Sequence, residues 1–175
     1  MSESSLVELR ENIISDRAVS AREIPKALSD VTDKFLSQLY VTEIENSDGV
    51  ALVALGGYGR AELAPSSDLD LMLIHQDRED IDSLADRLWY PLWDEGFKLG
   101  HSVRSVDQTL RLASTDLETA TSLLNGRLIA GDSVLLEDLL ARNEEQWVAY
   151  GLDRLDELAR NVRRRHLLSG EVAFL

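Results

Sequence analysis

Asp68 and Asp70 are the residues of this 175-residue chain whose types and spacing are best suited to chemistry. They belong to an alternating run, Asp-Leu-Asp-Leu-Met-Leu-Ile, at 68–74. Because a strand points successive side chains to opposite faces, we expect both carboxylates on one face and the leucines in the core. Two carboxylates on one face repel each other unless a hard cation lies between them, and Mg²⁺ commonly takes one or two carboxylates together with substrate phosphates. The pair therefore predicts a Mg²⁺ site for a phosphorylated substrate.

A glycine-rich turn, Gly-Gly-Tyr-Gly at 56–59, lies upstream of the aspartates and follows the apolar run 50–55. Gly56 and Gly57 allow the backbone to approach a phosphate closely and to present N–H donors to it. The turn is not a dinucleotide-binding fingerprint, because Glu62 stands where a third glycine is needed, and no Gly-Lys-Ser/Thr of a P-loop follows. A phosphate-binding turn beside a carboxylate pair predicts phosphoryl-group chemistry.

Apolar periodicity predicts the elements that position these residues. Helices are predicted over 4–14, 21–41 and 79–94, and strands over 50–55, 68–74 and 99–106. After Asp107 the pattern is helical throughout, with helices predicted over 107–113, 116–130, 132–142 and 144–168 and breaks near Gly131 and Asn143. The fold class is therefore α/β (α+β), a small sheet flanked by helices and followed by a helical bundle segment. We expect one structural domain, made of N-terminal helices (1–45), a core sheet (46–110) and a helical segment packed on it (111–175).

The composition restricts the class of protein. No run of about 18 apolar residues occurs and the acidic N-terminus lacks a signal-peptide pattern, so we expect a cytoplasmic protein without a membrane partner. The absence of cysteine removes disulfides, thiolate metal sites and cysteine nucleophiles. With a net charge of −14, most of the surface repels nucleic acid. The arginines at 160 and 163–165 are interpreted as favourable charges at a helix end, so no nucleic-acid partner is expected.

Two motifs resemble the DNA polymerase beta-like nucleotidyltransferase superfamily, in which a Gly-Gly or Gly-Ser turn precedes Asp-x-Asp or Asp-x-Glu. Here they read Gly-Gly-Tyr-Gly-Arg-x-Glu-Leu at 56–63 and Ser-Asp-x-Asp-Leu at 67–71. Three later stretches make the chain similar to the bacterial uridylyltransferases that modify the PII nitrogen-signalling protein: Gly-His-Ser-Val-Arg-Ser-Val (100–106), Asp-Leu-x-Thr-Ala-Thr (116–121) and Arg-Leu-Ile-Ala-Gly (127–131). The resemblance covers roughly residues 25–175 and implies a small mixed β-sheet of the polymerase beta-like type.

The resemblance implies that Asp68 and Asp70 are the catalytic metal ligands and that Gly56 and Gly57 bind the nucleotide phosphates. It departs from the superfamily at the third carboxylate, which many members place on a neighbouring strand. The stretch 99–106 contains no Asp or Glu, and Ser102 stands at the corresponding position. The alternatives left open for this acid are Asp107, Asp116 and Glu118.

Three more residues are implied at the nucleotide, each with an alternative role. Ser67 hydrogen-bonds the phosphates or orients Asp68. Arg60 reaches a phosphate or forms a surface ion pair with Glu62. Arg104 neutralises the triphosphate or forms a structural ion pair.

The implied reaction is transfer of UMP, or of AMP, from UTP or ATP to a tyrosine hydroxyl of PII, with Mg²⁺ as cofactor and release of pyrophosphate. The alternatives are an adenylyltransferase of the kind that acts on glutamine synthetase, another small nucleotidyltransferase, and a regulatory domain that binds nucleotide with weak catalysis or none. Family members are much longer and carry phosphohydrolase and ACT domains. The chain is therefore interpreted as an N-terminal domain excised from a longer protein.

Aromatic residues near the motifs are interpreted mainly as structural. Trp89 and Trp93, four residues apart on a predicted helix, are expected to pack rather than to stack on a base, and His101 is expected in the core. Tyr58 contacts either the nucleotide or the turn that carries it, and the sequence leaves both open.

Overall fold

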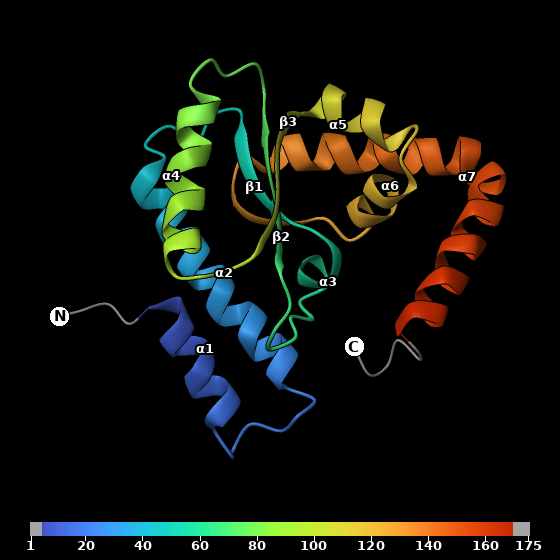
Figure 1. Ribbon diagram of the computed structural model, residues 1–175. Helices are drawn as coiled ribbons and strands as arrows, with labels where there is room; N and C mark the ends of the chain where they lie inside the picture. The colour runs from blue at the N-terminus through green and yellow to red at the C-terminus, as the bar shows by residue number, and fades with distance from the viewer. Residues whose placement is uncertain (1–4, 170–175) are drawn as a thin grey trace.

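The computed structural model describes residues 5–169, which form seven helices and four strands (Figure 1). The helices are α1 (Leu6–Ser15), α2 (Ile24–Glu43), α3 (Gly56–Gly59), α4 (Ile81–Asp94), α5 (Val106–Ala113), α6 (Leu117–Leu123) and α7 (Ser133–Ser169). The strands are β1 (Val50–Ala54), β2 (Leu69–His75), β3 (Leu99–Ser105) and β4 (Arg127–Gly131). Predicted segments that reach into residues 1–4 or 170–175 extend outside the described residues.

The four strands form one mixed sheet in the order β3-β2-β1-β4. Strand β1 is antiparallel to both β2 and β4, whereas β2 and β3 are parallel. Helices α1, α2 and α4 cover one face of the sheet, and α5, α6 and α7 cover the other (Figure 1). The fold class is therefore α/β with a small mixed sheet flanked by helices.

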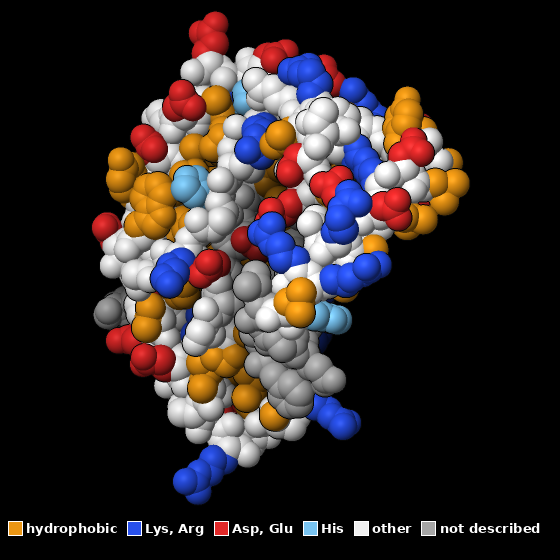
Figure 2. Space-filling view, turned by 45° about the vertical axis from the view of Figure 1, so that its right-hand side comes forward, with side chains coloured by type: hydrophobic (Ala, Val, Ile, Leu, Met, Phe, Trp, Pro, Cys, Tyr) orange, Lys and Arg blue, Asp and Glu red, His pale blue; other side chains and the backbone are white. Residues whose placement is uncertain are grey.

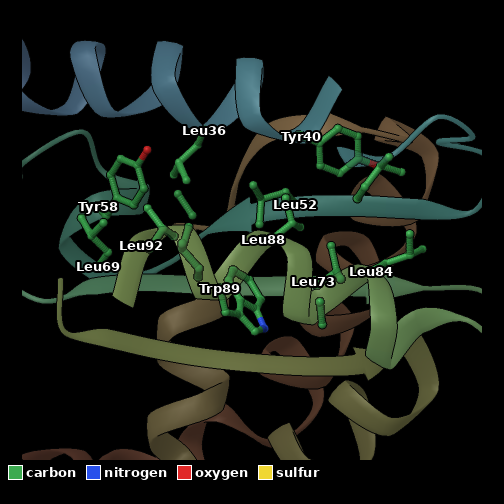
Figure 3. Packing of buried hydrophobic residues seen from close by; sticks show 14 of the residues in the cluster. Leu36, Tyr40, Leu52, Tyr58, Leu69, Leu73, Leu84, Leu88, Trp89 and Leu92 are labelled. Carbon is green, nitrogen blue, oxygen red and sulfur yellow. The ribbon is translucent and has the colours of Figure 1, made fainter. Parts of the chain in front are cut away.

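Strand β2 contributes to both faces of the sheet because its side chains alternate. Leu69, Leu71 and Leu73 belong to the core cluster beneath α2 and α4 (Figure 3). Met72 and Ile74 belong to the second cluster, beneath α5, α6 and α7. A fully buried leucine stabilises a fold by about 1.5–3 kcal/mol relative to an exposed one, so this burial fixes the register of the strand. In that register Asp70 lies on the face covered by α5–α7.

Strand β4 corrects the sequence prediction, which placed residues 127–131 partly in a helix over 116–130. The helix ends at Leu123, and the following turn is closed by a backbone hydrogen bond of 3.0 Å from Gly126 N to the Leu123 carbonyl. The next five residues pair with β1 at the sheet edge and are mostly half-buried. A strand of five residues is too short to show a clear alternating period, and it forms because β1 offers an edge with which it can pair. The fourth strand therefore lies within the segment 111–175, which was predicted to be helical.

The predicted helix break near Asn143 is also wrong, because α7 continues unbroken for 37 residues. Asn143 is buried, and its Nδ2 donates to the Ala120 carbonyl at 3.4 Å. The side chain thus joins α7 to α6 instead of ending the helix. In the described part of the chain, no helix is long and apolar enough to cross a membrane.

Candidate active site

Asp70 lies near the start of β2, and the parallel strand β3 starts beside this end of β2. Along residues 68–71 exposure alternates, with both aspartates exposed and both leucines buried. In the parallel register Asp70 pairs with Gly100 of β3. The two aspartates therefore lie at the same end of β2, and the negative charge of Asp68 acts on Asp70.

Two glycines form the seat of the Asp70 carboxylate. Gly56 has φ +56°, and a Cβ placed on it would lie 2.9 Å from Asp70 Oδ2. A Cβ on Gly100 would overlap with Asp70 Oδ1. Gly100 was not among the predicted site residues, although a glycine inside a strand marks a place where another group approaches closely. Any side chain at either position would displace the carboxylate.

A cavity of about 450 Å³ opens beside Asp70 on the face covered by α5 and α6. Its walls come from the β2–β3 end and the start of α6, and the polar residues that line it include Asp70, Ser102, Arg104, Asp116 and Glu118. A second cavity, of about 330 Å³, shares Asp116 and Glu118 with the first and reaches Arg164 of α7. Figure 2 shows acidic and basic side chains close together on a hollowed face of the molecule. The side chain of Arg165 lies outside the described part.

Burial and neighbouring charge determine the electrostatics of Asp70. Although Asp70 is an exposed residue, its carboxyl packs against Gly56 and Gly100, and this partial burial raises its pKa most. The negative charges of Asp68 and Glu118 raise the pKa further. No group of three Asp, Glu or His side chains that could hold a metal ion is found among residues 5–169. The aspartate pair thus supplies oxygen donors, which suit Mg²⁺, and further ligands would have to come from phosphates or water.

The three residues that the sequence left open as the third carboxylate, Asp107, Asp116 and Glu118, have different environments. Asp107 forms an ion pair of 2.7 Å with Arg142. Asp116 is the N-cap of α6, where it accepts a hydrogen bond of 2.7 Å from Thr119 N, and hydrogen bonding lowers its pKa. The Glu118 carboxylate has no hydrogen-bond or ion-pair partner in the described part of the chain. Of the three, Glu118 is therefore the acid that both lines the cavity and acts electrostatically on Asp70.

The other predicted nucleotide-binding residues are distributed around the cavity and the turn. Arg104 lines the cavity and forms no salt bridge with any side chain among residues 5–169. Arg60 pairs with Glu62 at 2.7 Å, and its Nη1 donates to the Gly56 carbonyl at 3.3 Å. The Ser67 hydroxyl donates to the Ala64 carbonyl at 3.0 Å rather than to Asp68. Of these three residues, Arg104 is the one that lines the cavity.

The aromatic residues differ in part from expectation. Trp89 is 2% exposed and packs in the core, as expected, whereas Trp93 is 38% exposed. His101 is exposed, so its predicted core position is wrong. It lies on the edge strand β3 with its ring centroid 5.3 Å from that of Trp93, and the sequence pattern did not reveal that this strand is an edge. Tyr58 is buried and packs within the protein.

Comparison with known proteins relates this chain to nucleotidyltransferases. Residues 7–102 match the family described as "Putative nucleotidyltransferase DUF294". A "Bifunctional uridylyltransferase/uridylyl-removing enzyme" of Streptomyces coelicolor is 41% identical over 168 residues, which cover 95% of this chain and 20% of the relative. A protein of the same name from Mycobacterium tuberculosis is 41% identical over 132 residues, covering 74% of this chain and 16% of the relative. The chain thus spans about one fifth or less of the length of these curated relatives.

Among solved structures, a "toxin-antitoxin with AMP-PNP" matches 74% of this chain and 98% of its own, at 14% identity and a TM-score of 0.43.

Proposed function

This chain belongs to the DUF294 family of nucleotidyltransferases, and from that membership we propose that it transfers UMP from UTP to a tyrosine hydroxyl of the PII signalling protein. The Streptomyces coelicolor relative, whose name includes uridylyl transfer, aligns with 95% of the chain, which favours UTP over ATP as the donor. In this reaction the tyrosine hydroxyl loses its proton to solvent and its oxygen bonds to the α-phosphorus. The bond from that phosphorus to the bridging oxygen of the β-phosphate breaks, and pyrophosphate leaves.

The observation that carries the proposal is the seat of Asp70 between Gly56 and Gly100, on the wall of a cavity of about 450 Å³. The close packing of the carboxylate against two glycines holds it beside the turn whose backbone would bind phosphate. Gly56 and Gly57 would offer N–H donors to the triphosphate. Arg104, on the cavity wall, would offset its negative charge.

We further propose that the reaction depends on Mg²⁺ held by Asp68 and Asp70. Their carboxylates are hard oxygen donors, and both are without an ion-pair partner in the described residues, so the donor set fits this ion. When bound there, Mg²⁺ would neutralise developing charge on the phosphates. Glu118, which also lines the cavity, would restrict how closely the nucleotide phosphates approach α6, since like charges repel.

Calorimetry with UTP and with ATP in the presence of Mg²⁺, followed by a pyrophosphate-release assay with PII, tests the proposal. We expect UTP to bind more tightly than ATP and pyrophosphate to appear only when PII is present. Asp70→Asn should abolish release, whereas Asp86→Asn, which changes an exposed aspartate on α4, should have no effect. Undiminished turnover by Asp70→Asn would reject the assignment.

A further inference from the structure

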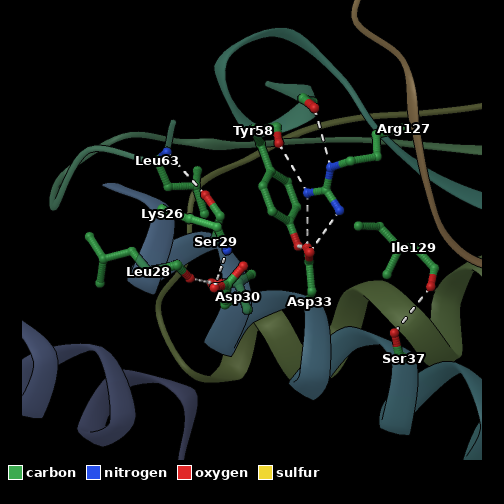
Figure 4. Close-up of polar contacts among 12 residues, drawn as sticks. Lys26, Leu28, Ser29, Asp30, Asp33, Ser37, Tyr58, Leu63, Arg127 and Ile129 are labelled. Carbon is green, nitrogen blue, oxygen red and sulfur yellow. Dashed lines mark hydrogen bonds and ion pairs between the residues drawn. The ribbon is translucent and has the colours of Figure 1, made fainter. Parts of the chain in front are cut away.

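Asp33, Tyr58 and Arg127 form a hydrogen-bonded cluster behind the glycine turn, which we refer to as the clamp (Figure 4). Tyr58 Oη donates to Asp33 Oδ1 at 2.6 Å. Arg127 Nη1 donates to Asp33 Oδ2 at 2.7 Å, and its Nη2 donates to Oδ1 at 3.0 Å. The clamp thus joins α2, α3 and β4 through a bidentate arginine–carboxylate pair, a geometry that adds directional specificity to charge.

Arg127 also holds the backbone of the turn. Its Nε donates to the Gly59 carbonyl and its Nη2 to the Tyr58 carbonyl, both at 3.2 Å. The guanidinium carbon lies 5.4 Å from the centre of the Tyr58 ring. The positive charge therefore lies at the carbonyl end of α3, whereas Gly56, at the other end, lies against Asp70. The clamp and the candidate catalytic carboxylate thus hold opposite ends of one four-residue helix.

Contacts outside α3 determine its orientation, since a helix of a single turn is not stable on its own. On its far side, a Cβ on Gly59 would overlap with the Asn125 carbonyl oxygen, in the loop before β4. Burial and the hydrogen bond to Asp33 raise the pKa of Tyr58 far above its usual range, so the phenol remains a neutral donor. The Asp33 and Arg127 side chains are 26% and 31% exposed, so the pair lies at the edge of the core rather than within it.

We propose that Asp33 and Arg127 are positioning residues for the nucleotide, which fix the turn so that the N–H groups of Gly56 and Gly57 meet the phosphates beside Asp70. This inference rests on the proposed function. Neither residue lines the cavity beside Asp70, so both act through the turn. Loosening the turn weakens phosphate binding even while the rest of the protein stays folded.

The test compares Arg127→Lys and Asp33→Asn with two control variants. Lysine keeps the charge of Arg127 but cannot donate to two carboxylate oxygens and two carbonyls at once. Asp30→Asn removes an exposed ion pair of 2.6 Å with Lys26 on the same helix. Leu139→Ala opens a cavity in the second core cluster, at a residue that does not line the cavity beside Asp70, and lowers stability by a different route. Calorimetry with UTP and Mg²⁺ is performed at a temperature at which circular dichroism shows every variant folded.

We expect Arg127→Lys and Asp33→Asn to weaken UTP affinity at least tenfold, while both controls bind like the wild type even though Leu139→Ala melts earlier. Amide hydrogen exchange gives a second readout that needs no nucleotide. The Gly59 amide bonds to the Leu55 carbonyl at 2.8 Å and the Arg60 amide to the Gly56 carbonyl at 3.3 Å. Both amides should exchange faster in Arg127→Lys, whereas those of β1 should keep the wild-type rate.

Wild-type affinity and wild-type exchange in the two clamp variants, with only thermal stability lost, would overturn the positioning role. Failure of the wild type to bind any nucleotide would instead reject the proposed function. In that event the exchange rates of Gly59 and Arg60 still decide whether the clamp orders the turn: faster exchange supports it and an unchanged rate refutes it.

Discussion

Replacing Gly100 by alanine tests the seat of Asp70 without removing any polar group. A Cβ at this position would overlap with Asp70 Oδ1, whereas ordinary van der Waals contact begins at 3.4 Å. The carboxylate must therefore move by about 1 Å. A misplacement of about 1 Å in a catalytic arrangement can reduce the rate about 10²-fold. The displaced group is the end of a rotatable side chain and Gly100 does not have a positive φ, so the expected cost in stability is small.

Gly96→Ala is the matched control, because this glycine lies in the turn before the same strand. It has φ +84°, and a Cβ there meets no atom within 4 Å. The substitution strains the backbone by about 1–2 kcal/mol without touching Asp70. For a domain of this size, 1 kcal/mol lowers the melting temperature by about 2–4 °C.

The assay for both variants measures steady-state pyrophosphate release with UTP, Mg²⁺ and PII, beside thermal melts followed by circular dichroism. We expect Gly100→Ala to lose about 10²-fold in kcat/KM with a nearly unchanged melting temperature. Gly96→Ala should show the reverse, a lower melting temperature with wild-type activity. Full activity in Gly100→Ala would refute the reasoning that Asp70 works from this seat.

Three further predictions concern charge. Glu118→Gln should allow UTP to bind at a lower pH than it does in the wild type. Asp70 must be ionised to bind a cation, and the negative charge of Glu118 helps to raise the pKa of Asp70. Calorimetric titrations across the acidic range check this prediction. Loss of UTP affinity at the same pH in the variant and in the wild type would contradict it. The pKa of Asp70 is raised in the folded state, so ionisation of Asp70 destabilises the metal-free protein as pH increases. Asp70→Asn should therefore be more stable than the wild type at neutral pH, by up to about 0.5 kcal/mol. Denaturant unfolding at several pH values measures this gain, which should disappear below the pKa of an ordinary carboxyl. Arg104→Gln should raise the KM for UTP about tenfold or more, by removing a charge-assisted contact of about 1.5–3 kcal/mol; equal KM values would exclude Arg104 from the nucleotide site.

The sequence predicted most of the elements that position the site. Strands β1, β2 and β3 were recognised because each has a short apolar or alternating pattern of its own. The alternation at 68–71 placed the two aspartates on one side of β2. Strand β4 was missed because its identity depends on pairing with β1, which no local pattern records. Asn143 was misread for a similar reason, since its partner lies on another helix.

The surroundings of the site were less predictable than its central residues. Gly100 could have been inferred from its place inside a strand, once the register with Asp70 was known. The clamp could not have been inferred, because 94 residues separate Arg127 from Asp33 and neither stands in a motif that reveals the partner. Long-range pairs of this kind become visible only when the chain is folded.

Transfer of label from UTP to PII tests the central claim most directly. With Mg²⁺ present, UTP labelled at the α-phosphate should label a tyrosine of PII, and UTP labelled at the γ-phosphate should not. Asp70→Asn should transfer no label, and Asp86→Asn should transfer as much as the wild type. Label arriving from the γ-phosphate, or equal transfer from the α-phosphate by Asp70→Asn, would contradict nucleotidyl transfer at this carboxylate pair.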